Sequence, residues 1–144
     1  MVNIRRVSPL EAKQLVDEGY TYVDVRTVEE FDTRHAEGAL NVPIARMGRA
    51  GAEPNPDFLP VMRRLFVEDA KIVVGCAIGT RSLRAAEMLV GAGFQDVADQ
   101  RAGMDGTRDP FGRLQEPGWA SAGLPMARGA DAGSYDRIKA RIAD

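Results

Sequence analysis

The sequence predicts a single α/β domain, with a central, mostly parallel sheet of about five strands and helices on both faces. Two observations lead to this prediction. Short apolar segments with the composition of strands alternate along the chain with segments whose apolar residues have helical spacing, a pattern typical of parallel sheets. The chain has 144 residues, which suits one domain with a substantial core. In sheets of this kind, ligands bind beyond the carboxyl ends of the strands.

The first part of the chain contains two helix starts with the same local pattern. Ser8-Pro9-Leu10-Glu11 has the residues of a capping box with proline at the first helical position, and it predicts a helix that Gly19 ends. Residues 20–25 follow as a buried strand. Thr27-Val28-Glu29-Glu30 repeats the capping-box pattern and predicts a short helix ending near Arg34.

The middle of the chain contains a second short strand over residues 40–42, which Pro43 closes. Residues 45–56 are rich in Gly, Ala and Pro and favour a loop. The next helix has one apolar face, which consists of Phe58, Val61, Met62, Leu65 and Phe66. Residues 72–74 form the strand that follows.

A helix that begins near residue 80 has its own apolar face, made by Leu83, Ala86, Leu89 and Val90. Gly91 and Gly93 end this helix, and residues 96–98 form the last strand. Close to the C-terminus, residues 134–143 predict a further helix with a narrow apolar stripe, made by Tyr135, Ile138 and Ile142. This helix docks either on the domain or on another subunit.

Composition excludes several classes of function. A net charge of −2, with 44% hydrophobic and 28% charged residues, gives no general attraction to nucleic acid or to anionic membranes. No apolar run reaches 18 residues, and the first residues lack the apolar stretch of a signal peptide. We therefore expect a cytoplasmic protein, unless an organelle-targeting segment has been removed.

The chain has one cysteine, Cys76. A single cysteine excludes an internal disulfide, a Cys-x-x-Cys redox pair and a cysteine-rich zinc site, and we expect no metal and no cofactor. Cys76 follows an apolar strand and precedes a helix, where unpaired N–H groups and the positive end of the helix dipole favour a thiolate. The pKa of a free cysteine, about 8.5, can fall to roughly 3.5–7.5 at such positions. The alternative is a buried cysteine that only fills the core.

The residues after Cys76 favour the reactive interpretation. Gly79 can adopt positive φ, and the polar residues after it suit a helix start. Successive N–H groups folded around a small concavity would form an anion nest for the sulfur or for a substrate oxyanion. The expected substrate-binding loop consists of Ala77, Ile78, Gly79, Thr80, Arg81 and Ser82. Within it, Arg81 either adds a charged, forked donor at the rim or is solvated.

This loop resembles the active-site loop of the rhodanese-like sulfurtransferases, a Cys-x-x-Gly-x-Arg/Ser type of segment between a strand and a helix. Further segments are similar to signatures of the same family, in the same order and spacing. They are Asp24-Val25-Arg26 to Phe31, His35-Ala36-Glu37-Gly38-Ala39-Leu40-Asn41-Val42-Pro43, Ala92-Gly93-Phe94, and Trp119 to Pro125. The resemblance implies a single rhodanese-like domain over residues 1–126, followed by a linker and C-terminal helix over residues 127–144.

The resemblance also implies an activity. Rhodanese-type enzymes transfer a sulfane sulfur from thiosulfate or a persulfide donor to cyanide, a thiol or a protein, through a persulfide on the catalytic cysteine, here Cys76. The expected partners are therefore a small sulfur-containing anion and a thiol or protein sulfur acceptor, while the oligomeric state is left open. Sulfite or a thiolate leaves without a strong general acid, so a thiolate and a set of N–H donors suffice.

The chain departs from the family pattern in one region. Ala102-Gly103 lies much further from Trp119 than in the family, so residues 103–117 are expected to form an inserted, irregular loop. Long loops often cover sites. Phe111 is thus a candidate cover, and the candidate substrate-steering residues are Arg101, Arg108 and Arg113. For Arg108 and Arg113 the simpler interpretation, solvated surface charges, is preferred.

Three polar residues are interpreted as support for the loop. Asp24, at a strand end, is placed to orient the active-site loop, and Arg26 is expected to pair with Glu30. His35, the only histidine, is the obvious candidate for a general base. We instead predict a supporting role for it, because the resemblance puts this position in a loop that supports the fold.

The sequence leaves two rival functions. Cysteine-dependent phosphatases and arsenate reductases need five residues between cysteine and arginine, whereas four separate Cys76 from Arg81 here, which makes a smaller pocket better suited to sulfur. The second rival is a sulfur carrier or interaction module with little turnover of free substrate. The small apolar residues Ala77 and Ile78 at the rim suit contact with a protein surface.

Overall fold

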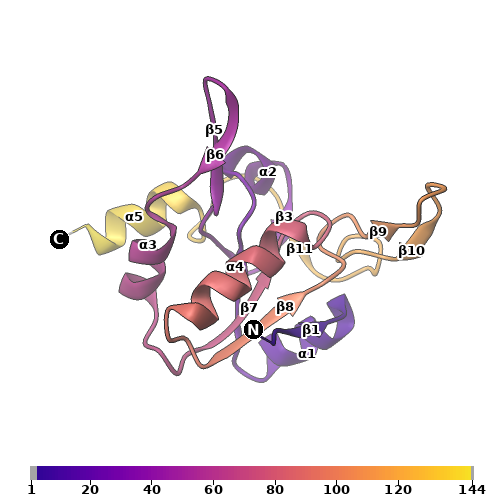
Figure 1. Cartoon of the computed structure of the whole chain (residues 1–144), viewed down its shortest axis with the longest axis horizontal. Coiled ribbons are helices and arrows are strands. Elements are labelled where there is room, and N and C mark those ends of the chain that lie inside the picture. The colour runs from indigo at the N-terminus through magenta and orange to yellow at the C-terminus, as the bar shows by residue number, and fades with distance from the viewer. Residues whose placement is uncertain (1–2, 144) are drawn as a thin grey trace.

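A five-stranded parallel sheet forms the centre of the molecule (Figure 1). The computed structural model describes residues 3–143. Residues 1 and 2 of the predicted domain, and residue 144 of the predicted C-terminal region, lie outside the described residues. The strands, in spatial order, are β1 (Arg5–Val7), β8 (Asp96–Gln100), β7 (Lys71–Gly75), β2 (Thr21–Asp24) and β4 (Leu40–Asn41). The predicted α/β class is confirmed.

Within residues 3–143, five helices accompany the sheet. They are α1 (Pro9–Asp17), α2 (Val28–Thr33), α3 (Phe58–Leu65), α4 (Thr80–Gly91) and α5 (Tyr135–Ile142). Both predicted capping boxes are present: Ser8 and Thr27 each accept from the N–H three residues later, where a glutamate bonds back to the cap. In α4, Ala85 is fully buried whereas Leu83 is partly exposed, so the buried face is rotated from the predicted one.

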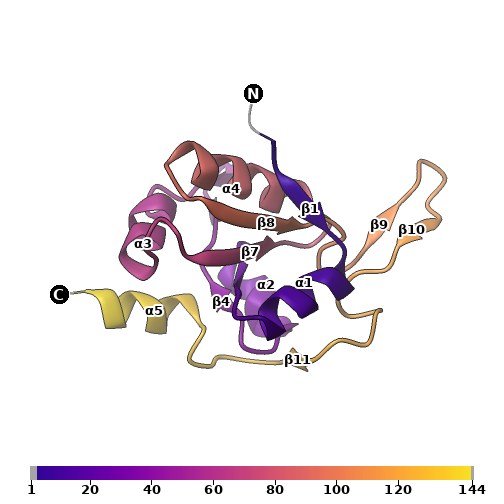
Figure 2. The same cartoon turned by 90° about the horizontal axis from the view of Figure 1, so that it is seen from below.

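The two faces of the sheet are buried by different elements (Figure 2). Residues alternate along each strand, so Val23, Ile72 and Val74 face one way and Tyr22 and Val73 the other. The first set packs against α3, α4 and α5. The second packs against α1, Phe31 of α2 and the segment around Trp119. Helices cover both faces of the sheet, and Cys76 lies beyond the carboxyl end of β7, at an end of the sheet.

The strand β1 was missing from the prediction. It lies at the sheet edge and pairs only with β8, with Arg6 opposite Asp99. Two of its three residues are exposed arginines, so it lacks the apolar run that identifies a buried strand. The strand β8 also continues beyond the predicted 96–98 to Gln100, through buried polar residues that sequence patterns assign to loops.

In the described part of the chain, three small antiparallel pairs lie outside the central sheet. The prediction of a loop over residues 45–56 was wrong: β5 (Ala45–Gly48) and β6 (Gly51–Pro54) form a hairpin that projects from the body (Figure 1). Its Gly- and Ala-rich strands have few buried side chains to give an apolar pattern. A second hairpin, β9 (Thr107–Arg108) with β10 (Leu114–Glu116), replaces the irregular excursion expected there. The third pair joins β3 (His35–Ala36) to β11 (Met126–Ala127).

The C-terminal helix docks on the domain. In α5, Ile138 is fully buried and Tyr135 nearly so, and both belong to the core cluster under α3 and α4. The segment before α5 reaches the edge strand β4, where Gly133 O accepts from Asn41 N at 2.8 Å. None of the helices within residues 3–143 has the length and apolar composition needed to cross a bilayer.

Candidate active site around Cys76

The loop that holds Cys76 begins where β7 ends, beside the carboxyl end of β2. The backbone at Gly75 lies very close to the Tyr22 side chain of β2, since a Cβ on Gly75 would overlap the Tyr22 hydroxyl. Burial raises the pKa of Tyr22 strongly, and the Asp24 and Cys76 charges act in the same direction. Tyr22 is therefore a neutral phenol under the loop, and its hydroxyl accepts from Gln100 Nε2 at 3.3 Å.

Two backbone donors and one hydroxyl group lie around the Cys76 sulfur. The backbone N–H groups of Gly79 and Ser82 point at Sγ, with N···S distances of 3.2 and 3.3 Å. The Ser82 hydroxyl oxygen is 3.4 Å from Sγ. These are the first-turn groups of α4 and the residue before it, so the helix dipole adds to the two N–H dipoles. The arrangement can hold a negatively charged sulfur in a small concavity.

Cys76 is also nearly enclosed, with 2% of its surface exposed. The two backbone donors thus point at the sulfur itself, and an anion nest for a substrate stays a prediction. Ile78, at the outer edge of the loop, is 57% exposed. The sulfur is therefore almost closed off from solvent, while an apolar side chain is exposed at the outer edge of its loop.

Gly79 allows the loop to turn. Its φ is +93°, and a Cβ there would overlap the Arg101 carbonyl oxygen. On the outside of this turn, Arg6 Nη2 donates to Gly79 O at 3.1 Å while Arg6 Nε pairs with Asp99 Oδ2 at 2.7 Å. The edge strand β1 therefore fixes the position of the loop from behind.

Gly103 fixes the other side of the loop. A Cβ on Gly103 would overlap the carbonyl groups of Cys76 and Ala77. Those same carbonyl groups accept from Met104 N and Asp105 N at 2.8 and 2.9 Å. The start of the predicted insertion is therefore hydrogen-bonded directly to the active-site loop.

Arg81 points away from the sulfur. Its two Nη atoms form a bidentate pair with Glu30 of α2, at 2.6 and 3.0 Å. The Arg81 hydrogen bond is the main cause that lowers the pKa of Glu30 to about 2, and the Thr27 N–H contributes. Of the two interpretations of Arg81, donor at the rim or solvated charge, the structure matches neither, because the guanidinium links α4 to α2.

The three candidate steering arginines lie in different environments. Arg101 pairs with Glu116 at 2.9 Å and so joins β8 to β10. Arg108 lines a pocket of about 450 Å³ together with Ile78. Arg113 and Phe111 contact each other near the hairpin tip, where Phe111 is 85% exposed and so does not cover the site. Arg108 thus shares a pocket with the loop residue Ile78, while its Nη1 donates to Gly112 O at 2.9 Å within the hairpin.

The expected supporting residues are all buried. The prediction that Arg26 pairs with Glu30 was wrong: Arg26 pairs with Asp24 at 2.8 Å, since Glu30 is engaged by Arg81. Both ring nitrogens of His35 have partners away from Cys76, Phe31 O at 2.8 Å and Asp131 Oδ2 at 2.7 Å. His35 also stacks on the Phe31 ring.

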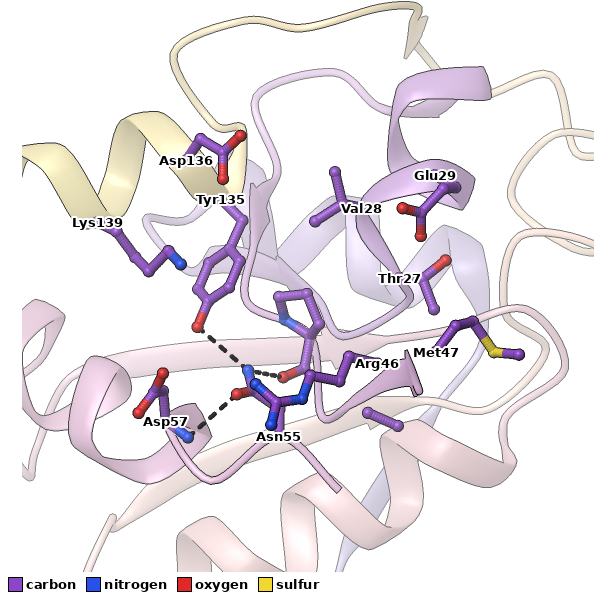
Figure 3. Close-up of a pocket in the computed structure, with 12 residues that line it drawn as sticks. Thr27, Val28, Glu29, Arg46, Met47, Asn55, Asp57, Tyr135, Asp136 and Lys139 are labelled. Carbon is purple, nitrogen blue, oxygen red and sulfur yellow. Dashed lines mark hydrogen bonds between the residues drawn. The ribbon is translucent and has the colours of Figure 1, made fainter. Parts of the chain in front are cut away.

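A separate pocket of about 260 Å³ lies between the start of α2, the β5 strand and α5 (Figure 3). At its base, Asn55 Nδ2 donates to Pro43 O and to the Tyr135 hydroxyl. These bonds attach the C-terminal helix to the hairpin, and the pocket is lined by elements other than the Cys76 loop. Among residues 3–143, no group of three or more His, Cys, Asp or Glu side chains forms a candidate metal site.

Sequence reasoning missed Arg6, Glu30 and Asp99 as neighbours of the loop. Each is far from Cys76 in the chain, and each reaches it through a strand pairing or a helix contact. One signal was available: a polar Asp99-Gln100 pair at the end of an apolar strand is unusual in a buried position.

Comparisons with known proteins agree with this geometry. The profile of the Rhodanese-like domain family matches residues 8–109. The chain is 40% identical over 119 residues to thiosulfate sulfurtransferase 16, chloroplastic, of Arabidopsis thaliana, covering 83% of this chain and 89% of that protein. It is 38% identical over 95 residues to thiosulfate sulfurtransferase 18 of the same plant, covering 65% of this chain and 70% of that protein.

Other curated relatives are longer. The chain spans 61% of rhodanese-like domain-containing protein 17 of Arabidopsis thaliana, with which it is 41% identical over 95 residues, 65% of its own length. Among solved structures, that of Rv0390 from M. tuberculosis has a TM-score of 0.74 and 25% sequence identity, and the match covers 89% of this chain and all of that one.

Proposed function

Because the chain belongs to the rhodanese-like domain family, we propose that it transfers a sulfane sulfur through a persulfide on Cys76. The donor is thiosulfate or a persulfide, and the acceptor is cyanide, a thiol or a protein. Relatives named thiosulfate sulfurtransferase support the reaction class. The cytoplasmic location remains a prediction from the sequence.

In the first half-reaction, the Cys76 thiolate attacks the outer sulfur of thiosulfate. A new S–S bond forms to Cys76 Sγ, the S–S bond of thiosulfate breaks, and sulfite leaves with the electron pair. Cys76 then carries a persulfide whose terminal sulfur is negatively charged. The N–H groups of Gly79 and Ser82 already point at Sγ, and donors held in place before the reaction stabilise charge without reorganisation.

In the second half-reaction, a nucleophilic acceptor attacks the terminal sulfur. With cyanide as the acceptor, a C–S bond forms, the persulfide bond breaks, and thiocyanate leaves while Cys76 returns to the thiolate. Neither half-reaction needs a second cysteine. The observation that carries the proposal is the pair of backbone donors directed at the only cysteine of the chain.

Intact-mass measurement tests this function. We expect the protein to gain the mass of one sulfur atom with thiosulfate or a persulfide donor, to lose it when cyanide is added, and to release thiocyanate. Cys76→Ser is expected to remain folded and to gain no sulfur, because a serine hydroxyl is a much weaker nucleophile. Sulfur gain by Cys76→Ser, or none by the wild type with either donor, contradicts the proposal.

A second candidate function is a sulfur carrier that accepts persulfide sulfur from a protein. The near-complete burial of Cys76 and the exposed Ile78 at its rim favour this candidate, because a partner surface could both open the loop and exclude water. The same experiment separates the two. Rapid thiocyanate formation supports the enzyme, whereas a stable sulfur gain with slow release supports the carrier.

A further inference from the structure

Arg6 connects the edge strand β1 to the active-site loop, although 73 residues separate it from Gly79. Its guanidinium donates in two directions, from Nε to Asp99 Oδ2 at 2.7 Å and from Nη2 to Gly79 O at 3.1 Å. The Arg6 side chain is 38% exposed, whereas the Asp99 side chain is fully buried. Neither half-reaction of the proposed function assigns a role to these contacts.

Asp99 determines where the guanidinium lies. Arg6 lies opposite Asp99 in the parallel pairing of β1 with β8. Asp99 Oδ1 has no hydrogen-bond partner among residues 3–143, while Oδ2 accepts from Arg6. A buried carboxylate is costly to leave without a charged partner. The strand register and this carboxylate therefore hold the Arg6 guanidinium against the outside of the active-site loop.

Gly79 lies between this guanidinium and the sulfur. Its carbonyl oxygen accepts from Arg6, while its N–H donates to Cys76 Sγ at 3.2 Å. The guanidinium packs closely, because a Cβ on Gly79 would lie 3.1 Å from Arg6 Nη2. A movement of Gly79 would therefore also move one of the two backbone donors that point at the sulfur.

The sulfur also takes the place of a capping side chain at the start of α4. Gly79 is the N-cap residue of this helix, and it has no side chain that could accept from the first turn. In most helices a side-chain oxygen of the N-cap residue accepts from an N–H of the first turn. Here Cys76 Sγ accepts from the N–H of Ser82, the third residue of α4, at 3.3 Å. The position of Gly79 thus sets the geometry between the sulfur and the helix start.

We propose that Arg6 is a positioning residue for sulfur transfer, an inference that rests on the proposed sulfurtransferase function. By holding the Gly79 carbonyl group, Arg6 keeps the Gly79 N–H directed at Cys76 Sγ. Donors that are in place before the reaction stabilise a negative sulfur without reorganisation. Arg6 acts through Gly79 and does not bind the sulfur donor, so loss of its bond to Gly79 slows the transfer step and leaves thiosulfate binding unchanged.

Arg6→Lys, made in the full chain, is the decisive variant. Lysine keeps a positive charge for Asp99, but its ammonium group lacks the fork with which arginine donates to two separate groups. We expect the maximal rate of sulfur loading from thiosulfate, followed by intact mass, to fall about tenfold, as for the loss of one hydrogen bond. The thiosulfate concentration that gives half the maximal rate should stay the same. Hydrogen–deuterium exchange of the amides of residues 77–82 should become faster.

Arg5→Lys, at an exposed neighbour on the same strand, is the matched control and should behave as wild type does in both measurements. The urea midpoint of each variant is measured as well, and slower loading counts only in protein that is fully folded. If Arg6→Lys does not fold, the double variant Arg6→Leu/Asp99→Asn decides, because it removes the buried charge together with the guanidinium. The double variant is expected to show the same slower loading and faster exchange.

Three results would overturn the proposal. The first is unchanged exchange in residues 77–82, and the second is unchanged loading in spite of faster exchange. The third is a higher half-saturating thiosulfate concentration with an unchanged maximal rate, since Arg6 would then bind the donor. Hydrogen exchange needs no sulfur donor, so failure of the positioning role is distinguishable from failure of the wild type to gain sulfur, which contradicts the proposed function itself.

Discussion

The ion pair between Glu30 and Arg81 connects α2 to the first turn of α4, so its loss should weaken the fold at the active-site loop. We predict that Glu30→Gln lowers the free energy of unfolding by about 1–2 kcal/mol at neutral pH. Gln keeps an oxygen that can accept from the Thr27 N–H, as Glu30 does now. The substitution therefore preserves the cap of α2 and removes mainly the charge that Arg81 requires.

The magnitude follows from the pKa of Glu30. Lowering it from 4.5 to about 2, at about 1.4 kcal/mol per pH unit, sets an upper limit of about 3.5 kcal/mol. Each side chain of the pair is 34% exposed, and solvent screening reduces the contribution to roughly half or less. Because the folded-state pKa is depressed, this stabilisation is complete above about pH 4.5 and is lost as the pH falls toward about 2.

Urea denaturation followed by Trp119 fluorescence measures this effect. Trp119 is the only tryptophan and is buried, so its emission reports on unfolding. With a urea dependence of about 2 kcal/mol per M, the midpoint should fall by about 0.5–1 M at neutral pH, and the difference from wild type should vanish in acid. Glu29→Gln, an exposed neighbour in the same helical turn, is the control. Equal midpoints for Glu30→Gln and Glu29→Gln would refute the reasoning.

Two further predictions concern packing. Gly79→Ala should lower the free energy of unfolding by at least about 2 kcal/mol and slow sulfur loading of Cys76, because the residue needs positive φ and a Cβ would overlap the Arg101 carbonyl. Urea denaturation measures the stability, and intact mass measures the loading. A loss of stability no larger than that of Gly91→Ala, where the space is open, would contradict this prediction. Ile138→Ala should cost about 2–4 kcal/mol by the same denaturation assay, since Ile138 is fully buried in the core. A cost as small as that of the exposed Arg137→Ala would show that α5 contributes little.

The parts of the fold that were predictable depend on local signals. The capping boxes at Ser8 and Thr27 involve residues three positions apart, so the sequence displays both partners together. The edge strand β1 and the β5–β6 hairpin were missed because few of their side chains are buried, which removes the alternation that marks a strand.

The candidate site divides in the same way. The position of Cys76 and the turn at Gly79 follow from the order strand, loop, helix, which is local. The partners of the loop are not local: Glu30 lies 51 residues from Arg81, and Arg6 lies 93 residues from Asp99. The expected pairing of Arg26 with Glu30 failed because a closer carboxylate, Asp24, and a distant arginine, Arg81, competed for the two groups.

The segment that precedes α5 has a consequence for how copies of this protein behave in concentrated solution. A strand at the border of a sheet offers free amide groups that a neighbouring molecule can pair with, which is a common route to aggregation. Here Gly133 O accepts a hydrogen bond from the backbone N–H of Asn41 in the border strand β4, and α5 packs over that strand. The C-terminal tail thereby shields one margin of the sheet, and a chain cut before it should self-associate more readily than the full-length protein.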